Sequence, residues 1–207
     1  MPARFGELLQ RTFEPISAEL PFVYRMGLAN LWLFRPLIKS RLADVPHTNA
    51  AMRTTIAPTL FRAGMKTNVL PAHAEATLNF RIHPQDSIGA VVDHVRSTID
   101  NPSVEVHRLD GAREASFVSD LDASSYRRLK RSIWETFGEI PVAPSMFVAA
   151  TDSRHFHDLT RDIYRFRPIR ARPSDRTRIH GTDERISVDN YLEMIHFQIR
   201  LIRNTTS

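Results

Sequence analysis

The sequence predicts a mixed fold, with an α+β first half followed by a second half of the α/β class. Residues 72–83 alternate apolar and polar side chains, which is typical of a half-buried strand. Residues 88–99 follow with apolar side chains at helical spacing. In the second half, helical and strand-like segments alternate over residues 119–202, as they do in the closing part of an α/β domain.

The first half shows the order of elements that defines its architecture. The predicted elements are a helix over residues 3–14, strands over 53–62, 72–83 and 104–107, and a helix over 88–99. Ser87 or Asp86 would cap the second helix, and Asn101-Pro102 would end it. Two strands, a helix and a strand indicate an antiparallel sheet covered by helices. This is ferredoxin-like architecture with its first strand missing.

Residues 20–38 are a strongly apolar stretch of the first half. Arg25, Asn30 and Arg35 interrupt it, and Pro36 would kink a helix. Its uninterrupted apolar length falls short of the ~20 residues that a membrane span requires. We therefore expect a buried helical hairpin, or a helix packed under another subunit. A helix lying on a membrane surface is the alternative.

The second half begins after a polar linker over residues 110–120. The pattern predicts a helix from about residue 120 to 137, strands at 145–150 and 162–167, and a last helix after Ser187. The last helix carries an apolar stripe formed by Leu192, Ile195, Ile199 and Ile202. Each predicted strand ends close to a polar block, which is how a buried strand delivers functional groups to its carboxyl edge.

Composition limits the classes of partner and cofactor. The chain has 207 residues, a net charge of +5 and no cysteine. Without thiolates, a metal would need histidine and carboxylate ligands, which suit zinc, manganese or cobalt. The arginines are spread along the chain rather than clustered, so nucleic acid is not expected as a partner. A basic RNA-binding module ranks last, because Phe80 falls on the apolar side of its strand.

Two polar blocks, residues 151–158 and 179–187, hold the candidate functional groups. His155 and His157 look like metal ligands, but residues two apart on a helix point in different directions, which favours a surface role. Spacing alone leaves His180 open as either a structural histidine or a ligand. Asp152 and Arg154 could bind a substrate carboxylate through the guanidinium fork, or form a surface ion pair with a cap.

Seven short motifs, spread in order over nearly the whole chain, carry a resemblance to a known family. They are Asn30-Leu-Trp-Leu-Phe-Arg-Pro-Leu37, Arg53-Thr-Thr55, Gly64-Met-Lys-Thr-Asn-Val-Leu-Pro71, Asn79-Phe-Arg-Ile-His-Pro84, Thr151-Asp-Ser-Arg-His-Phe156, Tyr164-Arg-Phe166 and His180-Gly-Thr-Asp-Glu-Arg-Ile-Ser187. Together they resemble the dinuclear zinc peptidases that include aminoacylase, glutamate carboxypeptidase and succinyl-diaminopimelate desuccinylase. The carboxypeptidase S and N-fatty-acyl-amino-acid hydrolase branch is the nearest in appearance.

The resemblance implies a division into three parts. Residues 1–50 would be a helical segment of the lid, incomplete at its N-terminus. Residues 51–116 would be the sheet and helix of the lid, or dimerisation, domain, and residues 117–207 the C-terminal part of the catalytic α/β domain. The family hydrolyses an amide next to a free carboxylate, with a zinc-bridging water activated by a glutamate base.

The resemblance also assigns roles to five residues. His180 matches the last zinc ligand of the family. Asn68 and Arg81 match lid positions that bind the carboxylate or the scissile carbonyl region, and Asp152 and Arg154 match a stretch that lines the substrate pocket. The implied partners are an N-acyl amino acid or small peptide as substrate and a second copy of the chain, bound through the lid. No nucleic acid and no membrane is expected.

The sequence departs from the family at its metal site. It contains no His-x-Asp triplet and no Glu-Glu pair, and the family histidine at the first lid strand is missing. We therefore expect no catalytic residue in this chain, at most one zinc ligand, and no activity of the chain alone. A fragment, a split gene product and a mis-called start remain open, as does a non-catalytic dimerisation module. Residues 1–207 show no signal peptide or membrane span. The compartment is not predicted, because any targeting segment would lie upstream.

Overall fold

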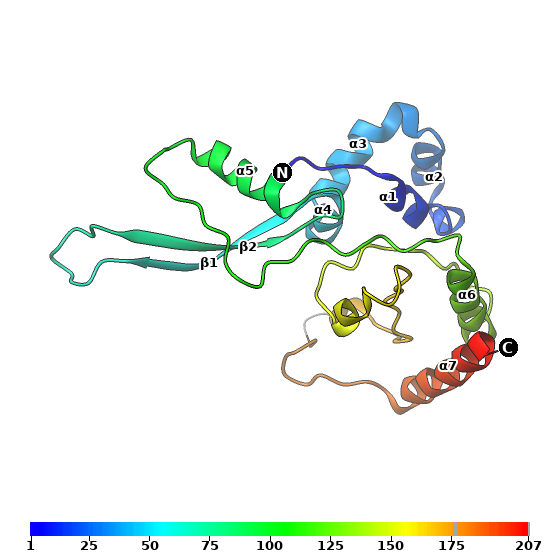
Figure 1. Cartoon of the computed structure of the whole chain (residues 1–207). Coiled ribbons are helices and arrows are strands. Elements are labelled where there is room, and N and C mark those ends of the chain that lie inside the picture. The colour runs from blue at the N-terminus through cyan, green and yellow to red at the C-terminus, as the bar shows by residue number, and fades with distance from the viewer. Residues whose placement is uncertain (176–177, 207) are drawn as a thin grey trace. The chain divides into compact units, whose positions relative to one another are not determined.

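The computed structural model describes residues 1–175 and 178–206, and the chain separates into two compact units. The first unit comprises Met1–Phe117 and Ala143–Ala150, and the second comprises Val118–Val142 and Thr151–Ser207. The mixture of helices with a small antiparallel sheet agrees with the predicted mixed fold (Figure 1). Each unit is described in turn.

The first unit begins with a series of short helices. These are α1 (Glu7–Phe13), the 3₁₀ helix η1 (Ser17–Glu19), α2 (Phe22–Ala29), α3 (Leu31–Ala43) and α4 (Pro46–Met52). A single residue, Asn30, joins α2 to α3, and its side-chain amide donates to the carbonyl of Met26 over 2.9 Å. Pro46 occupies the first turn of α4, where a backbone N–H is not needed for the helix.

Strands β1 (Thr55–Ala63) and β2 (Ala74–Arg81) form an antiparallel hairpin in the first unit. Thr55 lies opposite Arg81 at the base, and Ala63 lies opposite Ala74 near the turn. The register shifts between Pro58 and Leu60, because proline cannot donate to the ladder. Both strands were predicted, and the predicted alternation holds from Leu78 to Arg81.

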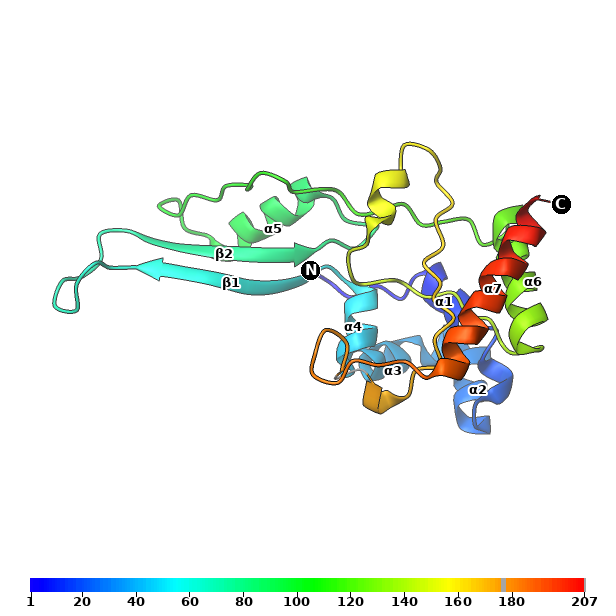
Figure 2. The ribbon, with the colours of Figure 1, turned by 90° about the horizontal axis from the view of Figure 1, so that it is seen from below.

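Helix α5 (Ile88–Ile99) follows the hairpin and lies alongside it in both views (Figures 1 and 2). Ser87 is its cap, since the hydroxyl accepts the backbone N–H of Ala90 over 3.1 Å. At the other end Asp100 takes a left-handed conformation, with φ of 44°, just before Asn101-Pro102. The structure therefore confirms Ser87, rather than Asp86, as the cap.

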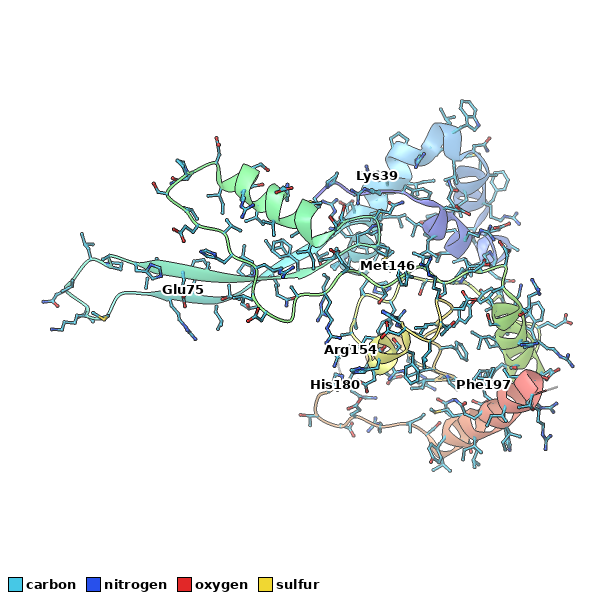
Figure 3. The ribbon with its side chains drawn as sticks, in the orientation of Figure 1. Lys39, Glu75, Met146, Arg154, His180 and Phe197 are labelled. Atoms are coloured by element: carbon cyan, nitrogen blue, oxygen red, sulfur yellow. The ribbon has the colours of Figure 1, made fainter. Side chains whose placement is uncertain are left out.

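The second unit is organised around two long helices, α6 (Ser124–Phe137) and α7 (Val188–Thr206), which lie side by side. Short 3₁₀ helices, η2 (Asp152–Phe156) and η3 (Pro173–Asp175), lie between them in sequence. The core of the unit is the Phe197 ring on α7, which is 1% exposed (Figure 3). It contacts the rings of Phe137 and Phe166, with centroids 6.2 and 5.1 Å away.

Three predicted strands are wrong. Residues 104–107, 145–150 and 162–167 have no strand structure, and β1 and β2 form the one sheet in the described part of the chain. A strand exists only through hydrogen bonds to a neighbouring strand. Apolar periodicity can mark a segment as suited to a sheet, but it cannot supply the neighbour.

Burial differs from expectation at two apolar surfaces. Trp32 of the predicted buried hairpin is 82% exposed, and Phe22 is 69% exposed. The stripe on α7 formed by Leu192, Ile195, Ile199 and Ile202 is also exposed, because α7 packs against α6 through the face that carries Phe197. A search of the described helices for a membrane-crossing segment finds none with the necessary length and apolar character.

Candidate functional site

Asn68 lies in the turn at the far end of the β1–β2 hairpin. Gly64, with φ of 72°, lets the backbone leave β1 in a left-handed conformation, and Pro71 closes the turn before β2. The backbone N–H of Val69 donates to the carbonyl of Lys66 over 3.4 Å. The side chain of Asn68 is exposed, so its amide is available to a ligand or to another chain.

Arg81 lies at the opposite end of the same hairpin. It is the last residue of β2 and its side chain is exposed. Ala74 and Arg81 are the first and last residues of the eight-residue strand β2, which places them roughly 23 Å apart. Asn68 lies beyond Ala74, so Asn68 and Arg81 of one chain cannot grip the same small carboxylate. Within the first unit, the structure keeps these two predicted substrate residues apart.

Asp152 and Arg154 lie on the short helix η2 in the second unit. Thr151 caps this helix by accepting the backbone N–H of Ser153 over 3.2 Å. The guanidinium of Arg165 donates to the Ser153 hydroxyl over 2.9 Å, which ties η2 to the segment around residue 165. Ser153 therefore anchors η2 through its hydrogen bonds to Thr151 and Arg165.

The side chains of Asp152 and Arg154 do not form a pair on η2. Both are exposed, and a 3₁₀ helix rotates by a third of a turn per residue, so residues two apart leave on different sides. Arg154 (Figure 3) instead donates from Nε to Nε2 of His155 over 3.2 Å. His155 Nε2 is the acceptor of this hydrogen bond. Arg154 keeps its terminal guanidinium nitrogens for an incoming acceptor.

His180 lies in a tight turn in which two residues have positive φ. Its own φ is 58° and that of Asp183 is 65°. Histidine and aspartate tolerate this conformation better than most residues. The backbone N–H of His180 donates to the Glu184 carboxylate over 3.2 Å, and Gly181 donates to the carbonyl of Arg178 over 2.8 Å. These contacts hold the turn and leave the His180 ring exposed.

The acidic residues beside His180 are engaged elsewhere. Asp183 pairs with Arg185 over 2.6 Å and Glu184 accepts the His180 backbone. Across residues 1–175 and 178–206, no group of three or more His, Cys, Asp or Glu side chains could hold a metal ion. A catalytic zinc site needs three protein ligands. The residues present therefore do not fit a catalytic zinc centre, and His180 remains a predicted ligand.

Sequence reasoning missed a buried polar cluster at the base of the hairpin, formed by Arg4, Thr54, His83 and Asp86. Asp86 is at its centre, with a side chain that is 2% exposed. Arg4 Nη2 lies 2.7 Å from one carboxylate oxygen, and the Thr54 hydroxyl donates to the other over 2.5 Å. Thr54 in turn accepts the backbone N–H of His83 over 2.9 Å. The cluster fixes the ends of β1 and β2 beside Arg81.

The charges of this cluster follow from burial and its contacts. Burial alone would raise the pKa of Asp86, but the hydrogen bonds from Arg4 and Thr54 and the nearby positive charge outweigh it and lower that pKa. For His83, burial lowers the pKa, although the Asp86 carboxylate opposes this effect. His83 Nδ1 accepts the backbone N–H of Gln85 over 3.2 Å, which requires that nitrogen to be unprotonated. The cluster thus holds Asp86 ionised and His83 neutral.

Comparison with known families identifies one domain. Residues 11–107 match the family model described as a peptidase dimerisation domain of the M20 type. This match covers α2 to α5 and includes the hairpin with Asn68 and Arg81. No solved structure matches the chain.

Relatives with curated names extend the similarity to the whole chain. The chain is 42% identical over 207 residues to an N-fatty-acyl-amino acid synthase/hydrolase of Danio rerio, covering 99% of this chain and 40% of the relative. It is 44% identical to a protein of the same name from Xenopus tropicalis, with the same two coverages. A probable carboxypeptidase S-like protein of Dictyostelium discoideum is 39% identical, over 93% of this chain and 37% of the relative.

These relatives agree with the resemblance that the motifs indicated. All three are much longer than the chain, which spans 37% to 40% of their length. The similarity runs through both units, so it includes Asp152, Arg154 and His180 as well as the hairpin. The chain is therefore similar along its length to proteins of the M20 peptidase family, and residues 11–107 match the dimerisation domain of that family.

Proposed function

We propose that the chain is a portion of a zinc-dependent hydrolase that cleaves the amide of N-acyl amino acids or small peptides with a free carboxylate. The observation that carries the proposal is the similarity to N-fatty-acyl-amino acid synthase/hydrolases over 99% of the chain. In this proposal Asn68, Arg81, Asp152 and Arg154 contact substrate, with Asn68 and Arg81 supplied by different copies of the chain, and His180 is one zinc ligand. Its helical lid segment is residues 1–50, and the sheet and helix of the lid are residues 51–116. The closing part of its catalytic domain is residues 117–207.

The proposal includes inactivity of the chain alone. One histidine cannot hold a catalytic zinc ion, let alone a zinc pair, and no step of the reaction is assigned to residues of this chain. The contribution of the chain would be recognition of the substrate by cationic side chains. Arg81 and Arg154 suit this role because both are exposed and a guanidinium binds a carboxylate through two parallel hydrogen bonds.

A binding measurement tests the recognition step. An N-acyl amino acid should shift the NMR signals of residues around Arg81 or Arg154, and its methyl ester, which lacks the carboxylate charge, should not. Arg81→Ala or Arg154→Ala should weaken binding, whereas Arg62→Ala should not, since Arg62 is an exposed arginine that already pairs with Glu75 over 3.4 Å. Equal binding of acid and ester would contradict the proposed role.

The alternative is a non-catalytic dimerisation module. It is favoured by the family-model match and by β1, an edge strand of the two-stranded sheet with eight of its nine residues exposed. Sedimentation with a zinc assay separates the two proposals. A homodimer that binds no zinc and no N-acyl amino acid favours the module, whereas carboxylate-dependent substrate binding favours the hydrolase portion.

A further inference from the structure

The helical hairpin α2–α3, residues 20–43, presents an unusual apolar surface in the first unit. Six of its large apolar side chains are more than half exposed: Phe22 69%, Val23 69%, Tyr24 65%, Trp32 82%, Leu33 55% and Leu37 57%. They come from two helices adjacent in space and joined by one residue (Figure 2). Large apolar side chains gathered in exposed positions on two adjacent helices are typical of sites of interaction.

The hairpin is a built structure rather than a loose segment. A Cβ added to Gly27 of α2 would lie 3.6 Å from Ile38 Cδ1 of α3, so the two helices meet closely at these residues. Arg35 donates to the carbonyl of Phe5 over 2.5 Å and lies 5.8 Å from the centroid of its ring. The two helices of the hairpin thus contact each other, and α3 also contacts the N-terminal segment. The exposed aromatic side chains Phe22, Tyr24 and Trp32 take no part in these contacts.

The charge of the hairpin limits what could cover it. Residues 20–43 contain Arg25, Arg35, Lys39 and Arg41 and no aspartate or glutamate. Arg25 and Arg41 are exposed, whereas Arg35 is engaged with Phe5. Cations flanking exposed Trp, Phe, Tyr and Leu side chains are the combination that binds the interface of an anionic membrane.

A second copy of the chain fits this surface less well. Self-association through a two-fold axis would place the same cationic residues opposite one another, without acidic partners in the hairpin. A membrane span is excluded for these helices by length, because α2 has 8 residues and α3 has 13. Helices that do not span a membrane can instead lie in the plane of its interface with their apolar side chains in the lipid.

We propose that α2–α3 is an interfacial binding surface for anionic lipid, with Trp32, Leu33, Leu37 and Phe22 entering the headgroup region and Arg25 and Arg41 contacting lipid phosphates. The proposal goes beyond the hydrolase function and does not depend on it. It adopts the membrane-surface alternative that the sequence left open for residues 20–38, in place of the expected buried hairpin or subunit contact.

The test is co-sedimentation of the full chain with vesicles. Binding is expected to vesicles of equal parts phosphatidylcholine and phosphatidylglycerol, and much less to phosphatidylcholine alone. Trp32 fluorescence should shift to shorter wavelength on binding, and Trp32→Phe should remove that shift. Arg25→Gln with Arg41→Gln should weaken binding by about fivefold per cation, since each cation near such a surface contributes about 1 kcal/mol.

Matched variants make the test specific. Leu33→Ser with Leu37→Ser should abolish vesicle binding, whereas Val104→Ser with Leu109→Ser, which are 47% and 64% exposed outside the hairpin, should not. Arg108→Gln with Arg113→Gln gives the same change in net charge at another place and should have little effect. Failure of the native chain to bind anionic vesicles overturns the proposal. It is also overturned if the Leu33→Ser/Leu37→Ser variant and the Val104→Ser/Leu109→Ser control lose vesicle binding to the same extent. A dimer that Leu33→Ser with Leu37→Ser converts to monomer would show a protein interface and would also overturn it.

Discussion

Asp86 shows how one buried carboxylate can fix a junction between several segments. It accepts hydrogen bonds from Arg4, near the N-terminus, and from Thr54, just before β1, and it lies beside the start of α5. A buried charge is stable only when it is paired and hydrogen-bonded. The sequence pattern suggested Asp86 as a helix cap, and nothing local to it revealed a partner as distant as Arg4, because ion pairs of this kind depend on tertiary contacts.

Asp86→Asn should lower the free energy of unfolding by about 2 kcal/mol, because it removes the charge that compensates the half-buried Arg4. Urea denaturation followed by circular dichroism measures the change. Asp93→Asn on α5 is the control, since Asp93 is 80% exposed and its pair with Arg96 is 4.0 Å long. That variant should stay within about 0.5 kcal/mol of the native chain. Equal losses in both variants would contradict the role given to Asp86.

His83 should make stability fall as the solution is acidified. Its pKa is lowered by burial in the folded chain, so below the ordinary value of 6.5 the unfolded chain takes up a proton first. Stability from this residue is therefore complete above pH 6.5 and is lost as pH falls through the lowered folded pKa. His83→Asn, which keeps an acceptor near Gln85, should reduce the pH dependence of the urea midpoint below pH 6.5. The same substitution at the exposed His47 should leave it unchanged.

At the scale of elements, local features could be predicted well. The alternation of apolar and polar residues predicted β2. Ser87 and Ser187 were predicted to cap α5 and α7. Their hydroxyls do so, since Ser87 accepts the backbone N–H of Ala90 and Ser187 accepts that of Asn190 over 3.2 Å. The predictions that failed concern which segments, distant in sequence, pack against one another. Helix α7 carries apolar residues on more than one face, and the sequence favoured the stripe of Leu192, Ile195, Ile199 and Ile202 as its inner face. The structure instead buries Phe197 together with Asn190, whose side chain bonds to Pro168 and Arg170.

The two faces of α7 give a sharp comparison. Phe197→Ala should destabilise the chain by about 3 kcal/mol or more, because it empties the centre of the second unit. Ile199→Ala, on the exposed stripe and 43% exposed, should cost less than about 1 kcal/mol. Thermal unfolding of the two variants measures the difference. A larger loss for Ile199→Ala would show that the aliphatic stripe is the buried face after all.

At the scale of the whole molecule, similarity to the M20 family could be recognised from short motifs, whereas the arrangement of the site could not. The motifs at residues 79–84 and 180–187 indicate the family by their sequence alone, and relatives cover 99% of the chain. Yet Asn68 and Arg81 lie at opposite ends of one hairpin, and His180 lies where the described residues offer no metal set. The arrangement of a site assembled from distant segments depends on tertiary contacts, which short motifs do not reveal.

The most direct test of the central claim is zinc content measured together with hydrolysis of an N-acyl amino acid by the purified chain. We predict no turnover and fewer than the two zinc ions that a two-metal site would bind. His180→Ala should remove any zinc that is bound, while His47→Ala at an exposed position should not. Turnover, or two zinc ions per chain, would contradict the view that this chain carries substrate-recognition residues of an M20 hydrolase without its metal centre.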